Sequence, residues 1–273
     1  MDVSRHFQPM KLLKRCIDAM QSSKLNTLHL HLTDSQSFPV LLNDVNVSMG
    51  SHGEEMLLLL SNLAKKGSFS PEKMYTKSDL LELVAYGRVR GVDIVPEIDM
   101  PAHTLSWGNA FKDVYINCSR TARSAQTPWN IYPLDPSKEK TYAIIYHVLA
   151  QVADIFPSRY LHIGGDEVSE QCWREDDELM SWAKEKGFAT RDITKYFEER
   201  VFSIVYSLGK VPIVWQGILD SHSMPAGESY AANHSYTRKS AGSDDDGNVE
   251  SRDDSNREPV VEPWKCWGGT VHL

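Results

Sequence analysis

The feature that most constrains the fold of this chain is a repeated order of helix-length amphipathic segments and short apolar runs. Residues 11–20 carry apolar side chains at helical spacing, and NTLHLHLTD at 26–34 then alternates as a strand does. The same order recurs along the chain, with a helix pattern followed by a strand pattern at 78–91 and 92–99, 139–156 and 159–165, and 193–209 and 210–217. Such alternation predicts βαβ units and a parallel sheet.

The number of these units favours an α/β fold of the (β/α)8 TIM-barrel type over a doubly wound sheet. Neither GxGxxG nor GxxxxGK[ST] is present, so both nucleotide-binding folds lack their fingerprint. A further short strand is expected at 260–264, and the chain begins within a first strand. We therefore predict an apparently incomplete barrel of about six of the eight units, in one domain over residues 1–273.

Two segments depart from the repeat. Residues 240–258, SAGSDDDGNVESRDDSNRE, are acidic and nearly devoid of apolar side chains, which predicts a disordered surface loop. Residues 42–75 show no regular pattern and are expected to form a long loop beside the second strand.

Composition excludes some classes of function. The formal net charge is -8 and no basic stripe occurs, which argues against nucleic-acid binding. No run reaches the roughly 18 apolar residues of a membrane span, and MDVSRHF at the start lacks the apolar region of a signal peptide.

The cysteines and glycosylation motifs do not by themselves decide in which cellular compartment the protein is found. The four cysteines, at 16, 118, 172 and 266, have no metal-type spacing, and all could be buried thiols. Cys118 and Cys172 lie in loop-like surroundings, where a bridge is easier than within strands. N-x-[ST] motifs begin at Asn46, Asn117 and Asn233, although such tripeptides also occur by chance.

Polar residues gather at the predicted carboxyl ends of the strands, where (β/α) barrels hold their active sites. Carboxylates bind hydroxyls and move protons, and tryptophan rings stack on the apolar faces of sugars. This composition, without a metal-ligand cluster, suits a sugar substrate; the residues are Asp2, Arg5, Asp34, Glu97, Asp99, His103, Asp166, Glu167, Trp215, Gln216 and Trp264.

Asp166 and Glu167 are neighbours in LHIGGDEV, at the end of a predicted strand. Ordinary glycosidases hold two carboxyl groups on opposite sides of the bond that they cleave. Successive strand residues point to opposite faces, so neighbours reach one substrate only where the chain turns. The pair therefore suits one proton donor and one helper, with the nucleophile supplied from elsewhere.

Six motifs, in order along almost the whole chain, resemble those of the family-20 glycoside hydrolases, the β-N-acetylhexosaminidases. HIGGDEV is similar to the family signature, and the others are MDVSRHF, LNTLHLHLTDSQSFP, VDIVPEIDMPAHTLSWG, VWQGILD and VVEPWK. The resemblance implies substrate-assisted retaining hydrolysis, in which the 2-acetamido oxygen of the sugar attacks the anomeric carbon and forms an oxazoline.

By this resemblance Glu167 is the general acid and then the base, and Asp166 accepts a hydrogen bond from the acetamido N–H. Asp34 and His103 match the family's support for the acid, an Asp–His–Glu relay. Asp99 matches a supporting position near the histidine. Ser35 stands where the family commonly has an acidic residue, and we expect the site to tolerate this replacement.

The resemblance also assigns binding and structural roles. Arg5 matches the arginine that binds the C3 and C4 hydroxyls, and Trp215 and Trp264 match walls of the acetamido pocket. Cys118 and Cys172 match a disulfide pair, which favours an oxidising compartment. The implied substrates are glycans ending in N-acetylhexosamine or chito-oligosaccharides, with no cofactor and no metal ion. A lysosomal, vacuolar or secreted location is expected, and a homodimer is a further expectation because related enzymes are often dimers.

Two alternatives stay open. The family's last two strands, which carry a tyrosine, a glutamate and a tryptophan of the sugar site, have no counterpart before Leu273. The chain could therefore be an inactive sugar-binding remnant, drawn from a fragment of a longer protein. A chitinase is the other alternative, although its acids are spaced, unlike the adjacent pair here.

Overall fold

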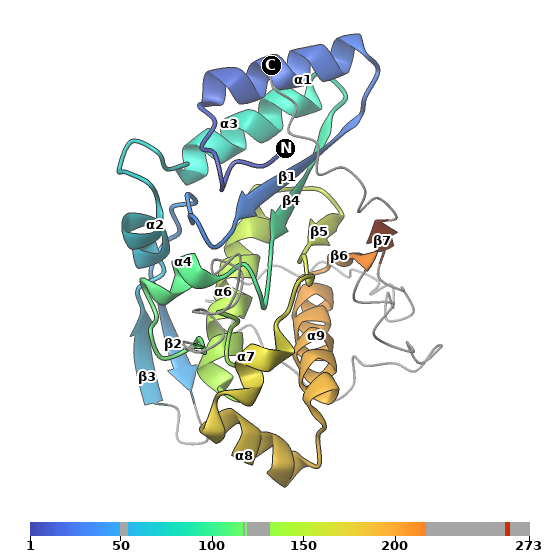
Figure 1. Ribbon diagram of the computed structural model, residues 1–273. Helices are drawn as coiled ribbons and strands as arrows, with labels where there is room; N and C mark the ends of the chain where they lie inside the picture. The colour runs from blue at the N-terminus through green and yellow to red at the C-terminus, as the bar shows by residue number, and fades with distance from the viewer. Residues whose placement is uncertain (50–53, 117, 119–131, 217–259, 263–273) are drawn as a thin grey trace, which may run out of the picture.

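The computed structural model describes residues 1–49, 54–116, 118, 132–216 and 260–262, and its centre is a parallel sheet in the order β1-β4-β5-β6-β7 (Figure 1). The strands are β1 Thr27–Thr33, β4 Asp93–Ile98, β5 Tyr160–His162, β6 Val211–Trp215 and β7 Val260–Glu262. Asp2 adds a parallel bridge to His31 of β1. Sequence order and sheet order agree, as they do in a (β/α) barrel, and the described residues form about six of its successive units.

The helices that connect these strands lie where the amphipathic patterns predicted them. They are α1 Met10–Ser22, α3 Lys77–Arg88, α6 Glu139–Ile155 and α9 Thr190–Ser207. The start of α3 is fixed by a capping box, in which Thr76 Oγ1 accepts from the Asp79 N–H and Asp79 accepts from the Thr76 N–H. The predicted parallel α/β fold is thereby confirmed.

The expectation of an irregular loop over 42–75 is wrong. An antiparallel pair, β2 Val45–Met49 and β3 Glu54–Leu58, is followed by helix α2 Ser61–Gly67. Val47, Leu58 and Leu63 are buried in the main core. These short elements form because their few apolar side chains are buried against the barrel, a tertiary contact that local periodicity does not display.

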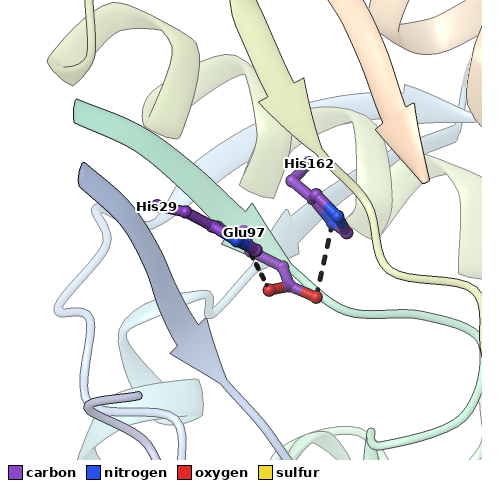
Figure 2. A group of neighbouring side chains, drawn as sticks. All are labelled: His29, Glu97 and His162. Carbon is purple, nitrogen blue, oxygen red and sulfur yellow. Dashed lines mark hydrogen bonds and ion pairs between the residues drawn. The ribbon is translucent and has the colours of Figure 1, made fainter. Parts of the chain in front are cut away.

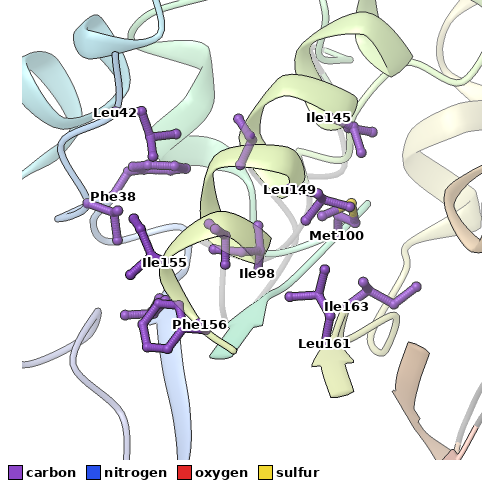
Figure 3. Packing of buried hydrophobic residues seen from close by; sticks show 14 of the residues in the cluster. Phe38, Leu42, Ile98, Met100, Ile145, Leu149, Ile155, Phe156, Leu161 and Ile163 are labelled. Atoms are coloured by element: carbon purple, nitrogen blue, oxygen red, sulfur yellow. The ribbon is translucent and has the colours of Figure 1, made fainter. Parts of the chain in front are cut away.

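The main core lies between the sheet and its helices (Figure 3). Ile145 and Leu149 of α6 belong to one buried cluster with Ile98 of β4, Leu161 of β5 and Ile163 just beyond it. Each fully buried aliphatic side chain of this cluster stabilises the packing of the helices on the sheet by roughly 1.5–3 kcal/mol.

A smaller core surrounds a disulfide between Cys118 and Cys172, so the alternative of free thiols at these two positions is wrong. Cys172 lies in α7 Glu170–Arg174, and the next helix, α8 Asp177–Lys186, adds Leu179 to the same cluster. Both cysteines are fully buried. The bridge thus ties the segment before α6 to the segment that follows β5.

Several predictions fall partly or wholly outside the described residues. The acidic stretch 240–258, Trp264, Asn117 and Asn233 belong to this group. Asn46 is exposed on β2, and its glycosylation stays a prediction. Among the described residues, none of the helices has both the length and the apolar character needed to cross a membrane.

Candidate active site

The register of the sheet places one row of polar residues side by side. His31 of β1 pairs with Asp2 on one side and with Glu97 of β4 on the other, and Glu97 pairs in turn with His162 of β5. Figure 2 shows the Glu97 carboxylate between the imidazoles of His29 and His162. Neighbouring residues of parallel strands point to the same face, so this row forms one continuous polar layer.

Asp34 follows β1 directly and is the centre of the charged contacts at the carboxyl ends of the strands. Its side chain is fully buried, and its two oxygens lie 2.7 Å from Arg5 Nη2, 2.9 Å from His31 Nε2 and 3.3 Å from His103 Nδ1. Burial alone would raise the pKa of Asp34, but the hydrogen bonds from His103 and His31 and the charge of Arg5 hold it well below its usual range.

His103 links Asp34 to the acidic pair. Its Nε2 lies 3.4 Å from Glu167 Oε2 and 3.7 Å from Asp166 Oδ1. Burial would lower the pKa of His103, yet its contacts with Asp34 and Glu167 and the nearby Asp99 raise it to about 11. The Asp34–His103–Glu167 arrangement expected from the resemblance is therefore present as a geometry.

The backbone is strained where this arrangement is built. His103 and Glu167 both have φ in the left-handed region, at 59° and 57°. A residue with a side chain rarely adopts such a φ, and its cost is of order 1–3 kcal/mol. His103 and Glu167 are in contact with each other, whereas the third residue with a side chain and a positive φ among the described residues, Lys24, lies at the end of α1.

The two glycines before the acidic pair allow the turn after β5. Gly164 has φ +65°, and a Cβ at that position would lie 1.7 Å from Asp99 Oδ1. The Gly165 N–H donates to the same oxygen at 3.0 Å. Burial is the main reason that the pKa of Asp99 is raised well above its usual value. Asp99 thus fixes the turn that carries Asp166 and Glu167.

The two acids differ in exposure. The side chain of Glu167 is 54% exposed, whereas that of Asp166 is 13% exposed. Glu167 is open to a ligand from outside, while Asp166 lies deeper in the same wall. One acid can therefore exchange protons with a bound molecule while its neighbour holds a fixed orientation.

Trp215, at the end of β6, is oriented from within the sheet. Its Nε1 donates to Glu97 Oε1 at 3.0 Å, and its ring lies 4.6 Å from that of His162, centre to centre. Glu97 also receives His29 Nε2 at 2.7 Å and faces His162 Nδ1 at 3.4 Å. This layer connects the tryptophan to the charged group around Asp34.

Sequence reasoning gave no role to His29, His31 and His162. The signal was available, because the histidines of HLHL alternate with leucines and so must share the face opposite the leucines. Their convergence on Glu97 depends on strand register, however, and periodicity alone does not supply a register.

Three groups of histidine and carboxylate side chains among the described residues are close enough to be considered for a metal ion. In each group the candidate ligand atoms lie within 4.8 Å of one another; the groups are His29, Glu97 and His162; His31, Asp34 and Asp99; and Asp99, His103 and Asp166. Contacts of 2.7 and 3.4 Å to Glu97 already explain the first group. An ion there would have to replace those contacts.

The fold and the site together define a barrel-type α/β protein with a cluster of buried charged side chains at the carboxyl ends of its strands. Comparison with known proteins identifies the family. The family model described as "Glycosyl hydrolase family 20, catalytic domain" matches residues 1–240. The chain therefore belongs to glycosyl hydrolase family 20.

Individual relatives agree with this assignment. The human protein "Beta-hexosaminidase subunit beta" is 32% identical over 222 residues, which are 80% of this chain and 36% of that protein. A solved chitobiase from Flavobacterium johnsoniae has a TM-score of 0.64 at 27% identity, covering 80% of this chain and 31% of the other. A solved family-20 beta-N-acetylglucosaminidase has a TM-score of 0.59 at 31% identity, covering 80% and 43%. The chain thus spans about a third of the length of the human relative.

Proposed function

We propose that this chain is the catalytic part of an exo-acting β-N-acetylhexosaminidase. It would release terminal GlcNAc or GalNAc from glycans or chito-oligosaccharides, with retention at the anomeric carbon. The observation that carries the proposal is the adjacent pair Asp166 and Glu167 at the end of β5, in contact with His103. Membership of the family and the names of the relatives support the same activity.

Glu167 is the general acid and base in this proposal. Its exposed carboxyl group donates a proton to the glycosidic oxygen while the acetamido oxygen of the substrate attacks C1 and the C1–O bond breaks. In the second step Glu167 takes a proton from water as the water attacks C1, and the C1–O bond of the oxazoline opens. His103 Nε2, at 3.4 Å, faces this carboxyl group and can stabilise the carboxylate that forms when the proton has been transferred.

Asp166 orients the internal nucleophile. Its carboxylate accepts a hydrogen bond from the acetamido N–H, which turns the acetamido oxygen toward C1, and its charge stabilises the positive oxazolinium ring. A fixed carboxylate is needed for this task because a misplacement of about 1 Å can cost about 100-fold in rate. The low exposure of Asp166, 13%, is consistent with such a fixed position.

Arg5 and Trp215 would bind the sugar itself. The Arg5 guanidinium is held by Asp2 at 2.8 Å and by Asp34 at 2.7 Å, yet its side chain stays 39% exposed and keeps donors for hydroxyl groups. Trp215, oriented by Glu97, offers a ring face on which a pyranose can stack. Trp264 remains a predicted second wall.

The proposal includes a lysosomal, vacuolar or secreted location, because the Cys118–Cys172 disulfide favours an oxidising compartment. A homodimer stays a prediction.

The test is hydrolysis of 4-nitrophenyl N-acetyl-β-glucosaminide by the full chain and by Glu167→Gln. We expect kcat to fall about 10²- to 10⁴-fold in the variant, the usual share of general acid–base catalysis. Glu170→Gln is the matched control, since Glu170 lies on α7 nearby and pairs only with Arg174 among the contacts described; it should keep wild-type activity.

Equal activity of Glu167→Gln and the wild type would refute the assigned role. A folded wild-type chain that binds N-acetylglucosamine without cleaving the substrate would instead support the sugar-binding alternative.

A further inference from the structure

We propose that His31, held between Glu97 and Asp34, is a positioning residue that extends the support of the catalytic acid into the barrel interior. In this arrangement His31 keeps Asp34 ionised, and ionised Asp34 in turn holds His103 against Glu167. The inference rests on the proposed function, because its consequence for catalysis is expressed through Glu167.

The hydrogen-bond geometry defines the charge of His31. Its Nδ1 lies 2.8 Å from Glu97 Oε2, and its Nε2 lies 2.9 Å from Asp34 Oδ2. An ionised carboxylate only accepts hydrogen bonds, so both contacts are hydrogen bonds when both ring nitrogens carry a proton. His31, which is 8% exposed, is therefore a buried imidazolium between two buried carboxylates.

Glu97 can anchor this cation because its own surroundings stabilise its charge. It is fully buried, and it receives His29 Nε2 at 2.7 Å and Trp215 Nε1 at 3.0 Å in addition to His31. Burial opposes ionisation of Glu97, but the imidazoles around it hold its pKa well below the usual range. The strand register of β1 and β4 sets the Glu97–His31 contact, so it does not depend on a mobile loop.

Other charged groups also face His31. Arg5 Nη1 lies 3.5 Å from His31 Nε2, and Asp2 holds the same guanidinium. An oxygen of Asp99 lies within 4.8 Å of the polar atoms of His31 and Asp34, while His162 and His29 lie beyond Glu97. Burial lowers the pKa of His31, but Glu97 and the hydrogen bonds to Asp34 and Glu97 outweigh it and raise the pKa to about 10.

His31 and Arg5 have different tasks at Asp34. Arg5 is 39% exposed and is proposed to turn its donors to the sugar, so its attraction for Asp34 is partly screened by solvent and shared with the substrate. His31 is 8% exposed and therefore less screened by solvent than Arg5. Charges in a site of low polarity interact more strongly than charges near water, and His31 is thus the constant partner of Asp34.

The expected consequence is a shift in pH dependence. Without the His31 cation the site loses a positive charge, so Asp34 and the carboxylate of Glu167, linked to it through His103, take up protons at a higher pH. The acidic limb of the kcat–pH profile should therefore move upward by about one pH unit in His31→Gln. We compare the ratio of variant to wild-type activity at two pH values. At the acidic end of the profile this ratio should be about tenfold lower than at neutral pH, since one pH unit is a tenfold change.

The variants are chosen to separate charge from shape. Glu97→Gln removes the anion and keeps a single oxygen, which can accept from either His31 or Trp215, because these two side chains contact different oxygens of Glu97. It should therefore move the limb in the same direction. His147→Gln is the matched control, because His147 lies on α6 against Tyr146, and it should leave the limb in place. Circular dichroism at each pH checks that every variant is folded, and a purely structural loss would lower activity equally at all pH values.

A second measurement does not depend on turnover. ¹⁵N spectra of the histidine side chains of the full chain should show His31 with both nitrogens protonated at pH 7. The pKa of His103 should rise in His31→Gln, because a neighbouring positive charge is removed while Asp34 stays ionised. If the wild type is inactive, the proposed function fails, and these spectra still decide the inference. A neutral His31, an unchanged His103 pKa, or an active wild type whose limb moves in neither His31→Gln nor Glu97→Gln would overturn it.

Discussion

The two faces of strand β1 carry opposite kinds of side chain and contribute in opposite ways. Leu28, Leu30 and Leu32 are buried in the main core together with residues of the outer helices. His29 and His31, which alternate with them, face Glu97 on the neighbouring strand. A single seven-residue strand thus separates an apolar interior from a charged one.

The difference between the two faces of β1 indicates which of them tolerates substitution. Apolar packing is non-directional and loses free energy roughly in proportion to the area that is removed. A buried ionic network depends on every member, because removing one charge leaves its partners uncompensated. We therefore expect substitutions on the charged face to affect both stability and activity, and substitutions on the leucine face to affect stability alone.

The largest effect is expected for Asp34→Asn, which preserves shape and removes the charge shared by Arg5, His31 and His103. The free energy of unfolding should fall by about 3–5 kcal/mol, the usual cost of breaking a buried ion pair. We expect kcat for the nitrophenyl substrate to fall about 100-fold or more. Urea unfolding and steady-state kinetics measure the two effects.

The pH dependence of this stability loss follows from the depressed pKa of Asp34. Its ionised form stabilises the fold above the ordinary value of 3.8, and that contribution is lost as the pH falls through the depressed folded-state pKa. The difference between wild type and variant should shrink accordingly in strong acid. Asp113→Asn is the control, since Asp113 is exposed and pairs with Lys140; an equal loss there would contradict the distinction between interior and surface.

Leu30→Ala should weaken the packing on the apolar face of β1 and leave the contacts of the charged face in place. Leu30 is fully buried, so we expect the free energy of unfolding to fall by about 2–5 kcal/mol. The kcat–pH profile of the folded fraction should keep its wild-type shape. Leu57→Ala, at a side chain that is 54% exposed, should change stability by less than about 0.5 kcal/mol. A shifted profile in Leu30→Ala would mean that the two faces are coupled.

The smallest effect is expected for an ion pair outside the barrel. Lys77 Nζ lies 2.6 Å from Asp154 Oδ2 and joins α3 to α6, yet the two side chains are 48% and 66% exposed. Exposed pairs contribute about 0–1 kcal/mol, so Lys77→Gln should lower the free energy of unfolding by less than about 1 kcal/mol. A loss as large as that of Asp34→Asn would show that burial does not govern the strength of these pairs.

The sequence predicted the sheet and its connecting helices well. The segments 26–34, 92–99 and 159–165 contain β1, β4 and β5, because long periodic patterns report which face is buried. The sequence did not predict the elements within 42–75, because β2, β3 and α2 are short and depend on contacts with the barrel.

The candidate site divides in the same way. Asp34, His103, Asp166 and Glu167 were recognised because they belong to local motifs, and the structure brings them into contact. Their assigned roles remain proposals. His31 was missed because one of its two partners, Glu97, lies on another strand, and the register of the two strands cannot be read from the sequence.

The sequence by itself determined the order of the strands, the adjacent acids and the glycines that let them turn, since these follow from residue type and spacing. Only the tertiary structure decided which charges meet. Parallel strands are joined through helices, so the alignment of His31, Glu97 and His162 arises from packing and register rather than from any local pattern. The charge on His31 is a property of that alignment.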